Sequence, residues 1–289
     1  MRKLESAQIV VDGNTFNHMG RVVRTYKPGL NWAGVGFTVR NNTFSNGPHS
    51  GVNGHGYLSV FEDNLFVNLT RECTDSSAFY TGFSWTQRGN ALRRNVFRNV
   101  RNNTRLAFYQ GLWNSAIYLD EEIGGWEIVN NTIQNCAAGV FINGGRDNTV
   151  VGNYFTSGDT DIVFNPWGTY SKPEDPAEPC HWFCNASAVP LFPPNNWMCF
   201  RKELVAVGAF DESTNSTIDD SLFVKTFPAL KDVYNNRPCF PVGNRIAENR
   251  YCHKGAIPHP GGVFLSQTTS DVESWGSFVL GNAEDCSKK

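Results

Sequence analysis

The chain has 289 residues, enough for one large domain or two small ones. Hydrophobic residues make up 40% and charged residues 18% of it, which is the balance of a globular protein and excludes a disordered one. Lys plus Arg number 25 against 27 Asp plus Glu, so no basic field exists to attract a nucleic-acid backbone, and no nucleic-acid partner is expected.

Seven segments share a short frame of alternating residues, followed by Asn, one variable residue and an aromatic or aliphatic residue. The Asn positions are 14, 42, 64, 95, 131, 153 and 249, and the first five gaps are 28, 22, 31, 36 and 22 residues. A minimum of 22 with variable excess indicates a fixed coil that carries loops of different length. Each coil buries a small apolar set and must stack on its neighbours. The frame therefore predicts an all-β fold, a right-handed parallel β-helix, in which a single strand winds as a solenoid.

The Asn of the frame has a structural role in this prediction. Asn tolerates left-handed backbone angles, so it suits the corner between two short strands. Stacked Asn side chains can also hydrogen-bond from coil to coil. The residue two places later should point inward and fill the core. A leucine-rich repeat would need several Leu in each period, and Leu is scarce at these positions.

The frame divides the chain into three parts. Residues 1–165 are predicted coils with inserted loops at 26–32 and 101–114, and they start without an apolar leader, so we expect an N-terminal part with the secretion signal to be missing. Residues 166–241 form a flap rich in Cys, Pro and aromatic residues, with short helical turns near 219–223 and 227–230. Residues 242–289 return to the coil pattern, and the expected state is a monomer.

Eight cysteines are present, and five of them lie between Cys180 and Cys252. An even count clustered in a loop-rich region predicts disulfides, at least two of them between residues 180 and 252, and an oxidising, secreted location. Zinc is the rival interpretation, but Cys180 and Cys184 are spaced too widely for a tight knuckle and no second pair follows. No metal site is therefore predicted. Six Asn-X-Ser/Thr sequons also fit secretion, and no run is long enough to span a membrane.

Three predicted strands align with one another, at residues 77–82, 115–120 and 138–143. Alternation places Phe79, Ile117, Leu119, Val140 and Ile142 inside. The outward column is then Tyr80, Tyr118 and Phe141, with Asp120 and Asn143 in the next outward column. An outward aromatic column beside polar groups is a natural platform for sugar rings, so the expected partner is a polysaccharide or oligosaccharide.

A polar cluster lies near this column, and its members are Asp75, Asp120, Glu121, Glu122, Arg146 and Asp147, with Trp85 and Arg88 close in sequence. Carboxylates one or two coils apart would be about 5–10 Å from each other, which suits the two-carboxylate chemistry of glycoside hydrolysis. Asp120 is expected to face solvent near Arg146 and to stay ionised, which leaves Glu121 as the acid. The alternative is that these charges form solvated turns, that 144–148 is a tight turn with a structural Arg-Asp pair, and that Glu122 is only solvated.

His49 lies in a Gly-rich segment, residues 47–56, where a ligand can approach the backbone. It is a candidate substrate contact or acid/base group. The alternative is that this loop histidine is incidental.

The chain resembles a group of secreted right-handed parallel β-helix proteins of the pectin lyase-like superfamily, over about residues 10–250. The resemblance rests on Gly47-Pro48-His49, on the segments 75–82 and 85–90, on Ala116-Ile117-Tyr118-Leu119-Asp120 and on 144–148. It implies a carbohydrate-active protein, with Asp120, Glu121, Asp147 and Asp75 as catalytic candidates. The implied substrate contacts are His49, Tyr80, Trp85, Arg88, Tyr118, Asn143 and Arg146.

The chain departs from this group's pattern at four places. It has Phe83 and Ser84 where the group often has Arg-Asp, Glu121 where a second Asp is common, and Asn165 where an Asp often follows. Three functions stay open: a glycoside hydrolase, a polysaccharide lyase or epimerase, and a non-catalytic glycan-binding protein. No cofactor is expected, except calcium if the protein is a lyase.

Overall fold

The structure is a computed structural model. It describes residues 4–102, 114–165, 200–231, 233 and 241–253, and three short strands at 263–265, 276–278 and 283–285. The flap that the sequence predicts at 166–241 therefore lies partly outside the described residues, as do its cysteines.

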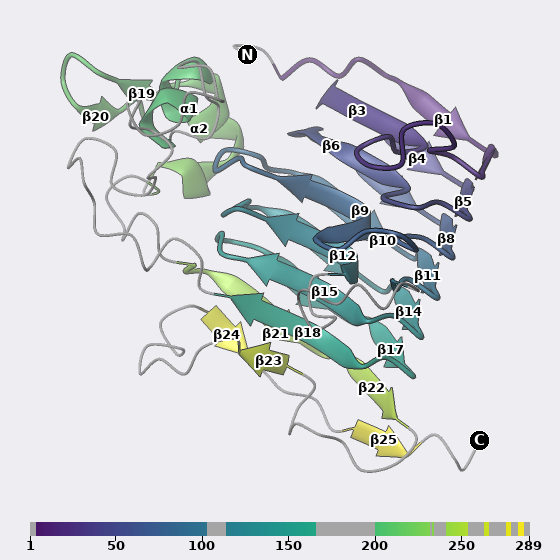
Figure 1. Ribbon diagram of the computed structural model, residues 1–289. Coiled ribbons are helices and arrows are strands. Elements are labelled where there is room, and N and C mark those ends of the chain that lie inside the picture. The colour runs from purple at the N-terminus through teal and green to yellow at the C-terminus, as the bar shows by residue number, and fades with distance from the viewer. Residues whose placement is uncertain are drawn as a thin grey trace, which may run out of the picture.

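Three parallel sheets, here named A, B and C, form the walls of a solenoid (Figure 1). Sheet A contains β1 (Val10–Asp12), β4 (Thr38–Arg40), β7 (Val60–Glu62), β10 (Asn90–Arg93), β13 (Trp126–Val129), β16 (Thr149–Val151), β21 (Asn244–Ala247) and β24 (Gly276–Phe278). Sheet B contains β2 (Thr15–Asn17), β5 (Thr43–Ser45), β8 (Leu65–Val67), β11 (Val96–Arg98), β14 (Thr132–Gln134), β17 (Tyr154–Thr156), β22 (Arg250–His253) and β25 (Ala283–Asp285). Sheet C contains β3 (Leu30–Val35), β6 (Val52–Tyr57), β9 (Ser76–Gly82), β12 (Asn114–Asp120), β15 (Ala138–Asn143), β18 (Thr160–Asn165) and β23 (Val263–Leu265).

The chain runs from C to A to B in each coil, and every strand pairs in parallel with its counterpart one coil away. β12, for example, lies between β9 and β15 in sheet C. The predicted right-handed parallel β-helix is confirmed. One prediction needs a correction at its edge: residues 30–32, expected in a loop, open strand β3, while most of the loop predicted at 101–114 lies outside the described residues.

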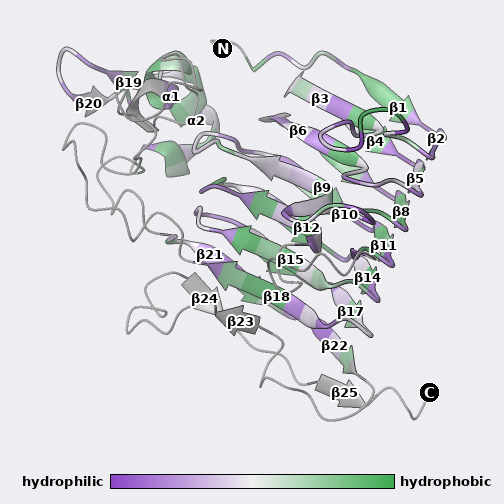
Figure 2. Ribbon diagram, viewed as in Figure 1, coloured by the Kyte–Doolittle hydropathy of each residue, from purple (hydrophilic) through white to green (hydrophobic). Residues whose placement is uncertain are grey.

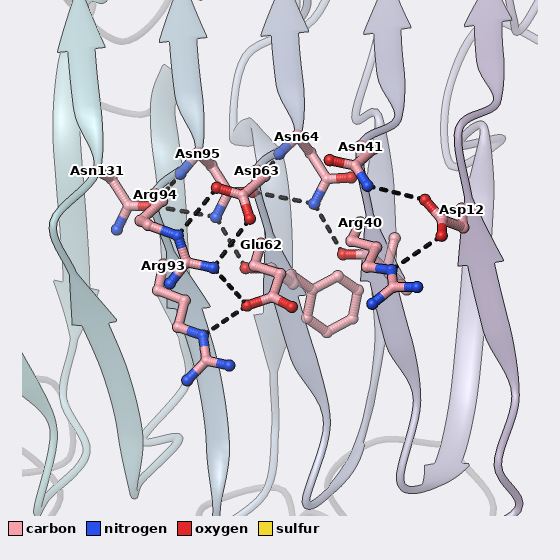
Figure 3. A network of polar contacts seen from close by, with 12 residues as sticks. Asp12, Arg40, Asn41, Glu62, Asp63, Asn64, Arg93, Arg94, Asn95 and Asn131 are labelled. Atoms are coloured by element: carbon pink, nitrogen blue, oxygen red, sulfur yellow. Dashed lines mark hydrogen bonds and ion pairs between the residues drawn. The ribbon is translucent and has the colours of Figure 1, made fainter.

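The seven frame Asn residues form a continuous ladder between sheets A and B. Figure 3 shows three of its members, Asn64, Asn95 and Asn131. Each side-chain amide donates to the side-chain oxygen of the next, at 2.9–3.1 Å, from Asn14 to Asn249. The left-handed angle expected for these Asn residues falls instead on the residue before each one, including Asn41, Asp63 and Arg94. This corrects the prediction, because the corner residue turns the backbone and the ladder Asn links the coils.

The residue two places after each ladder Asn points inward, as predicted. Phe16, Phe44, Phe66 and Phe97 stack face to face with ring centroids 4.7–5.0 Å apart. Ile133, Phe155 and Tyr251 continue the same column in register. Figure 2 shows hydrophobic residues recurring on β12, β15 and β18 of sheet C, whose inward members join this core. This apolar column and the amide ladder beside it both link successive coils.

A second ladder follows sheet B. Asn46, Asn68, Asn99 and Asn135 each come directly after a sheet B strand, each has a positive φ, and successive amides are 2.7–3.2 Å apart. Here the left-handed residue is itself the ladder Asn. The left-handed Asn at a corner between strands, which the sequence predicted for the first ladder, is thus found in this second ladder.

Between β18 and β21, the described residues 200–231 form a helical segment. It contains α1 (Phe200–Ala206), a hairpin of β19 (Phe210–Asp211) and β20 (Ser216–Thr217), α2 (Leu222–Thr226) and a 3-10 turn at Pro228–Leu230. The helical turns predicted near 219–223 and 227–230 thus match α2 and the 3-10 turn, whereas α1 was not anticipated. The segment lies beside the ends of β3, β6 and β9 (Figure 1), and its Leu204 and Phe223 share an apolar cluster with Tyr57 and Trp85.

Glu203 of α1 fixes the helical segment to the loop that follows β9. Its carboxylate is buried and accepts hydrogen bonds from the Ser84 hydroxyl, the Trp85 backbone N–H at 2.7 Å and the Thr86 hydroxyl at 2.7 Å. Burial raises the pKa of Glu203, and these donors oppose that rise.

None of the helices that the structure describes could span a membrane.

Candidate functional site

The aromatic column predicted on sheet C exists. Tyr118 pairs in register with Tyr80 and with Phe141, and its ring centroid is 5.3 Å from that of Tyr80 and 4.5 Å from that of Phe141. Tyr118 and Phe141 are buried, however, and only Tyr80 is partly exposed. The aromatic column therefore lines the site from within the protein, and the expectation that it forms an open platform for sugar rings is corrected.

Asp120 ends strand β12 and lies at the centre of a hydrogen-bond network. Its Oδ2 accepts from the Tyr80 hydroxyl at 2.5 Å, and its Oδ1 accepts from the Asn143 amide and from the Glu121 backbone N–H, each at 2.8 Å. Asn165 donates in turn to the Asn143 side-chain oxygen at 2.6 Å, which fixes the direction of the Asn143 amide. Gly82, opposite Asp120 on β9, leaves space for it, since a Cβ there would lie 3.1 Å from the Asp120 Cβ.

The side chain of Asp120 is buried, with 6% of its residue surface exposed. The sequence prediction that Asp120 faces solvent is therefore wrong. Burial raises the pKa of Asp120, while the donors from Tyr80, Asn143 and Glu121 act in the opposite direction. Because its partners all donate to it, the network favours the ionised carboxylate.

Asp75 and Glu121 lie within electrostatic reach of Asp120. Burial raises the pKa of Glu121 to about 8, and the charges of Asp120 and Asp75 add to the rise. Asp75 precedes β9 and reaches solvent, yet nearby protein atoms and the Asp120 charge raise its pKa to about 6, while Tyr118 opposes the rise. The fold thus brings together three predicted carboxyl groups, here named the carboxyl cluster, with different proton affinities.

Tyr26 is a neighbour of this cluster that the sequence did not reveal. Burial and the charges of Asp75 and Asp120 raise the pKa of its hydroxyl, although the residue is 63% exposed. Its ring lies 4.8 Å from that of His49, which is buried and hydrogen-bonded to the Ser50 hydroxyl at 3.1 Å. Burial lowers the pKa of His49 to about 4, so the imidazole is neutral at pH 7. No sequence signal linked the segment before β3, which holds Tyr26, to the aligned strands.

Arg88, Arg146 and Asp147 form a separate group. Arg88 is buried and donates to Asp147 at 2.8 Å and to the backbone oxygens of Trp85 and Gln87 at 2.8 and 2.7 Å. Arg146 is also buried, with its Nε 3.5 Å from Asp147. This arrangement supports the structural Arg-Asp pair that the sequence left open.

Two further expectations are corrected by burial. Trp85 is 2% exposed and packs in the cluster that holds the helical segment, so its placement does not match the expected substrate contact. Glu122, expected to be solvated, is 1% exposed, and burial raises its pKa well above the ordinary value. Trp85 is covered by the helical segment and Glu122 lies in the buried turn after β12, and local charge and polarity could not indicate either burial.

The fold and this site define a right-handed parallel β-helix with a carboxyl cluster on the outer face of one sheet. The chain belongs to the NosD family, described as periplasmic copper-binding protein (NosD), whose model matches residues 4–175, more than half of the chain. Comparisons with curated proteins and with solved structures find no match.

Proposed function

We propose that the chain is a glycoside hydrolase that binds a polysaccharide along sheet C and cleaves it at the carboxyl cluster. The observation that carries the proposal is the convergence of Asp75, Asp120 and Glu121 with raised pKa values beside the Tyr80–Tyr118 pair. Glycoside hydrolysis needs one carboxyl group that is protonated at working pH and one that is ionised. This cluster offers both.

Glu121 is the acid in this proposal. With a pKa of about 8 it holds its proton at pH 7 and gives it to the glycosidic oxygen as the C1–O bond breaks. Asp75 is the base, because it reaches solvent and is ionised above its pKa of about 6. It takes a proton from the water that attacks C1, so the water adds across the broken bond.

Asp120 is a positioning residue in this proposal. Both of its oxygens are occupied by donors from Tyr80, Asn143 and Glu121, which leaves little freedom for proton exchange with a substrate. Its buried charge raises the pKa of its two neighbours and lies where positive charge develops on the sugar in the transition state.

A lyase or epimerase would need a cation to neutralise a uronate carboxylate. Arg88 and Arg146 were the candidates, but Arg88 is committed to Asp147 and to two backbone oxygens, and Arg146 is buried beside the same Asp147. This commitment favours hydrolysis over elimination. A non-catalytic glycan-binding protein is the remaining alternative, and it differs from a hydrolase in binding a polysaccharide without cleaving it.

The family description names copper, and we tested the described residues for a copper site. No group of three or more His, Cys, Asp or Glu side chains is placed to hold a metal ion in the part of the chain that the structure describes. None of the described histidines and cysteines, the ligands that copper prefers, belongs to such a group. The described residues do not fit copper, so copper has no part in this proposal.

We place the protein outside the cytoplasm. Cys252 is disulfide-bonded, which fits an oxidising compartment such as the periplasm named in the family description. The periplasmic or secreted location is testable by fractionation of the cells that produce the full-length protein.

The test is a screen on polysaccharides with product analysis, using the wild-type chain, Asp75→Asn and Glu121→Gln. Hydrolysis gives new reducing ends without a new double bond, and elimination gives an unsaturated product that absorbs in the ultraviolet. Each variant should lose at least about a hundredfold in turnover while remaining folded. Glu127→Gln, at an exposed glutamate of β13, is the matched control. Binding without turnover in the wild type would reject catalysis, and an unsaturated product would reject hydrolysis.

A further inference from the structure

A hollow of about 350 Å³ lies at the corner after sheet B. It is lined by Asn68, Arg71, Asn99, Arg101 and Asn135 and shares no residue with the carboxyl cluster. Its volume is at the lower end of the range for ligand sites, about 300–1,000 Å³. The lining side chains are all polar, so a ligand here must be polar too.

The floor of the hollow is the second Asn ladder. Asn135 donates to Asn99 at 2.7 Å, and Asn99 donates to Asn68 at 3.2 Å. Each amide carries two hydrogens and each side-chain oxygen has two lone pairs, so one ladder bond leaves capacity for a ligand on every rung. Neighbouring rungs are about 4.8 Å apart. A row of combined donors and acceptors at this spacing suits the hydroxyl groups of a sugar.

Two arginines from neighbouring coils flank the ladder. Arg101 is held in place by the backbone oxygens of Asn135 and Cys136, each at 3.3 Å, and by the exposed Asp159 at 3.2 and 3.4 Å. Arg71 is exposed and makes no ion pair with any residue that the structure describes. The hollow therefore has one guanidinium held in place, that of Arg101, and a second, that of Arg71, without an ion-pair partner among the described residues. The exposed Asp159 carboxylate offsets part of the charge of Arg101.

We propose that this hollow binds an anionic saccharide, with a carboxylate of the sugar between Arg71 and Arg101 and its hydroxyls on the ladder amides. Guanidinium groups recognise carboxylates through paired N–H donors, which a neutral sugar cannot satisfy. A simple anion would leave the amides of Asn68, Asn99 and Asn135 unused. The site is distinct from the carboxyl cluster and does not depend on the hydrolase proposal.

The test is titration calorimetry at low salt with trigalacturonate, maltotriose and sodium sulfate as ligands. The wild type should bind trigalacturonate and give no heat with maltotriose. Arg71→Gln should weaken trigalacturonate binding about tenfold, the loss expected for one hydrogen bond between charged groups. Asp159→Asn should strengthen binding, because it removes the carboxylate that competes for Arg101.

Three controls define the result. Arg93→Gln makes the same change in net charge at an arginine paired with Glu62 on sheet A (Figure 3), and binding should change less than about twofold. Arg71→Gln should leave the melting temperature unchanged. Asp120→Asn should leave this binding intact, which separates the hollow from the carboxyl cluster on sheet C. The proposal would be overturned if maltotriose or sulfate bound as tightly as trigalacturonate. It would also be overturned if Arg71→Gln left the affinity for trigalacturonate unchanged.

Discussion

At the scale of single residues, Asp120 and Glu121 illustrate how adjacent carboxyl groups acquire different chemistry. The Asp120 oxygens are occupied by a tyrosine hydroxyl, an amide and a backbone N–H, all of which stabilise negative charge. Glu121 is partly buried beside that charge, and its pKa rises to about 8. One turn of the chain thus holds an anion and, at neutral pH, a neutral acid.

Replacing Asp120 with Asn should lower activity at pH 7 by about an order of magnitude and leave the fold intact, because the buried anion near the sugar is lost. The pKa values of Asp75 and Glu121 should both fall, since the Asp120 charge raises both. Carbon NMR titration of the two carboxyl groups measures this without a substrate. Near-normal turnover together with unmoved titration curves would reduce Asp120 to a turn residue.

Glu121 should also make the stability of the folded protein depend on pH. Its pKa in the folded state, about 8, exceeds the ordinary value of 4.5, so the folded state holds the proton more tightly. The stability that this provides is complete below pH 4.5 and is lost as the pH rises towards 8. Glu121→Gln should therefore raise the melting temperature by about 3 °C at pH 8.5, roughly 1 kcal/mol for a domain of this size, and leave it unchanged at pH 4.

Calorimetric melting at both pH values tests the Glu121 prediction, with Glu127→Gln as the exposed control. A gain at pH 4 equal to that at pH 8.5 would show that the substitution acts through packing and not through the carboxyl charge.

At the scale of elements, the first Asn ladder should contribute strongly to stability. Asn95 is buried, and its side chain makes four hydrogen bonds. The amide donates to the Phe61 backbone oxygen and to the Asn131 side chain, and the side-chain oxygen accepts from the backbone and side chain of Asn64. Asn95→Ala should cost about 3 kcal/mol, because buried donors and acceptors lose their partners. Asn14→Ala, at the exposed end of the same ladder, should cost about 1 kcal/mol or less. Equal losses in urea unfolding would contradict a role that depends on burial.

The contact between α1 and the loop after β9 makes a second element-scale prediction. The Glu203 carboxylate accepts hydrogen bonds from a hydroxyl group and a backbone N–H. In Glu203→Gln, the side-chain NH₂ would replace one accepting oxygen and would point at these donors. We expect about 2 kcal/mol of destabilisation and faster proteolysis within residues 200–231. Glu212→Gln, at an exposed site of the same segment, is the control. Unchanged proteolysis of the Glu203 variant would mean that the apolar cluster alone holds the segment.

At the scale of the whole molecule, the cysteines report on the compartment and on the predicted staples. Cys73 and Cys136 are free and buried, and Cys252 is disulfide-bonded. The sequence predicts at least two disulfides between residues 180 and 252, which lie mostly outside the described residues. Thiol counting on the unreduced, denatured protein should give no more than half of the cysteines as free thiols. A full count of free thiols would refute both the staples and the oxidising location.

The sequence by itself determined the solenoid, because its information is local and repeats. Asn95 and the inward Phe97 are two residues apart in one corner, so each coil specifies its own ladder rung and core residue. The alignment of three strands likewise predicted that Tyr80, Tyr118 and Phe141 would be neighbours.

Only the tertiary structure decided which of the polar residues are buried and with whom they pair. Arg88 meets Asp147 across 59 positions, and Glu203 meets Trp85 across 118. Such contacts depend on how loops of unequal length fold back on the coils, and the coil frame carries no information about that. Asp120 was recognisable from its strand, but its burial under Tyr80 and Asn143 comes from side chains on the neighbouring coils. The chemistry of the site therefore follows from stacking, whereas the fold follows from the repeat.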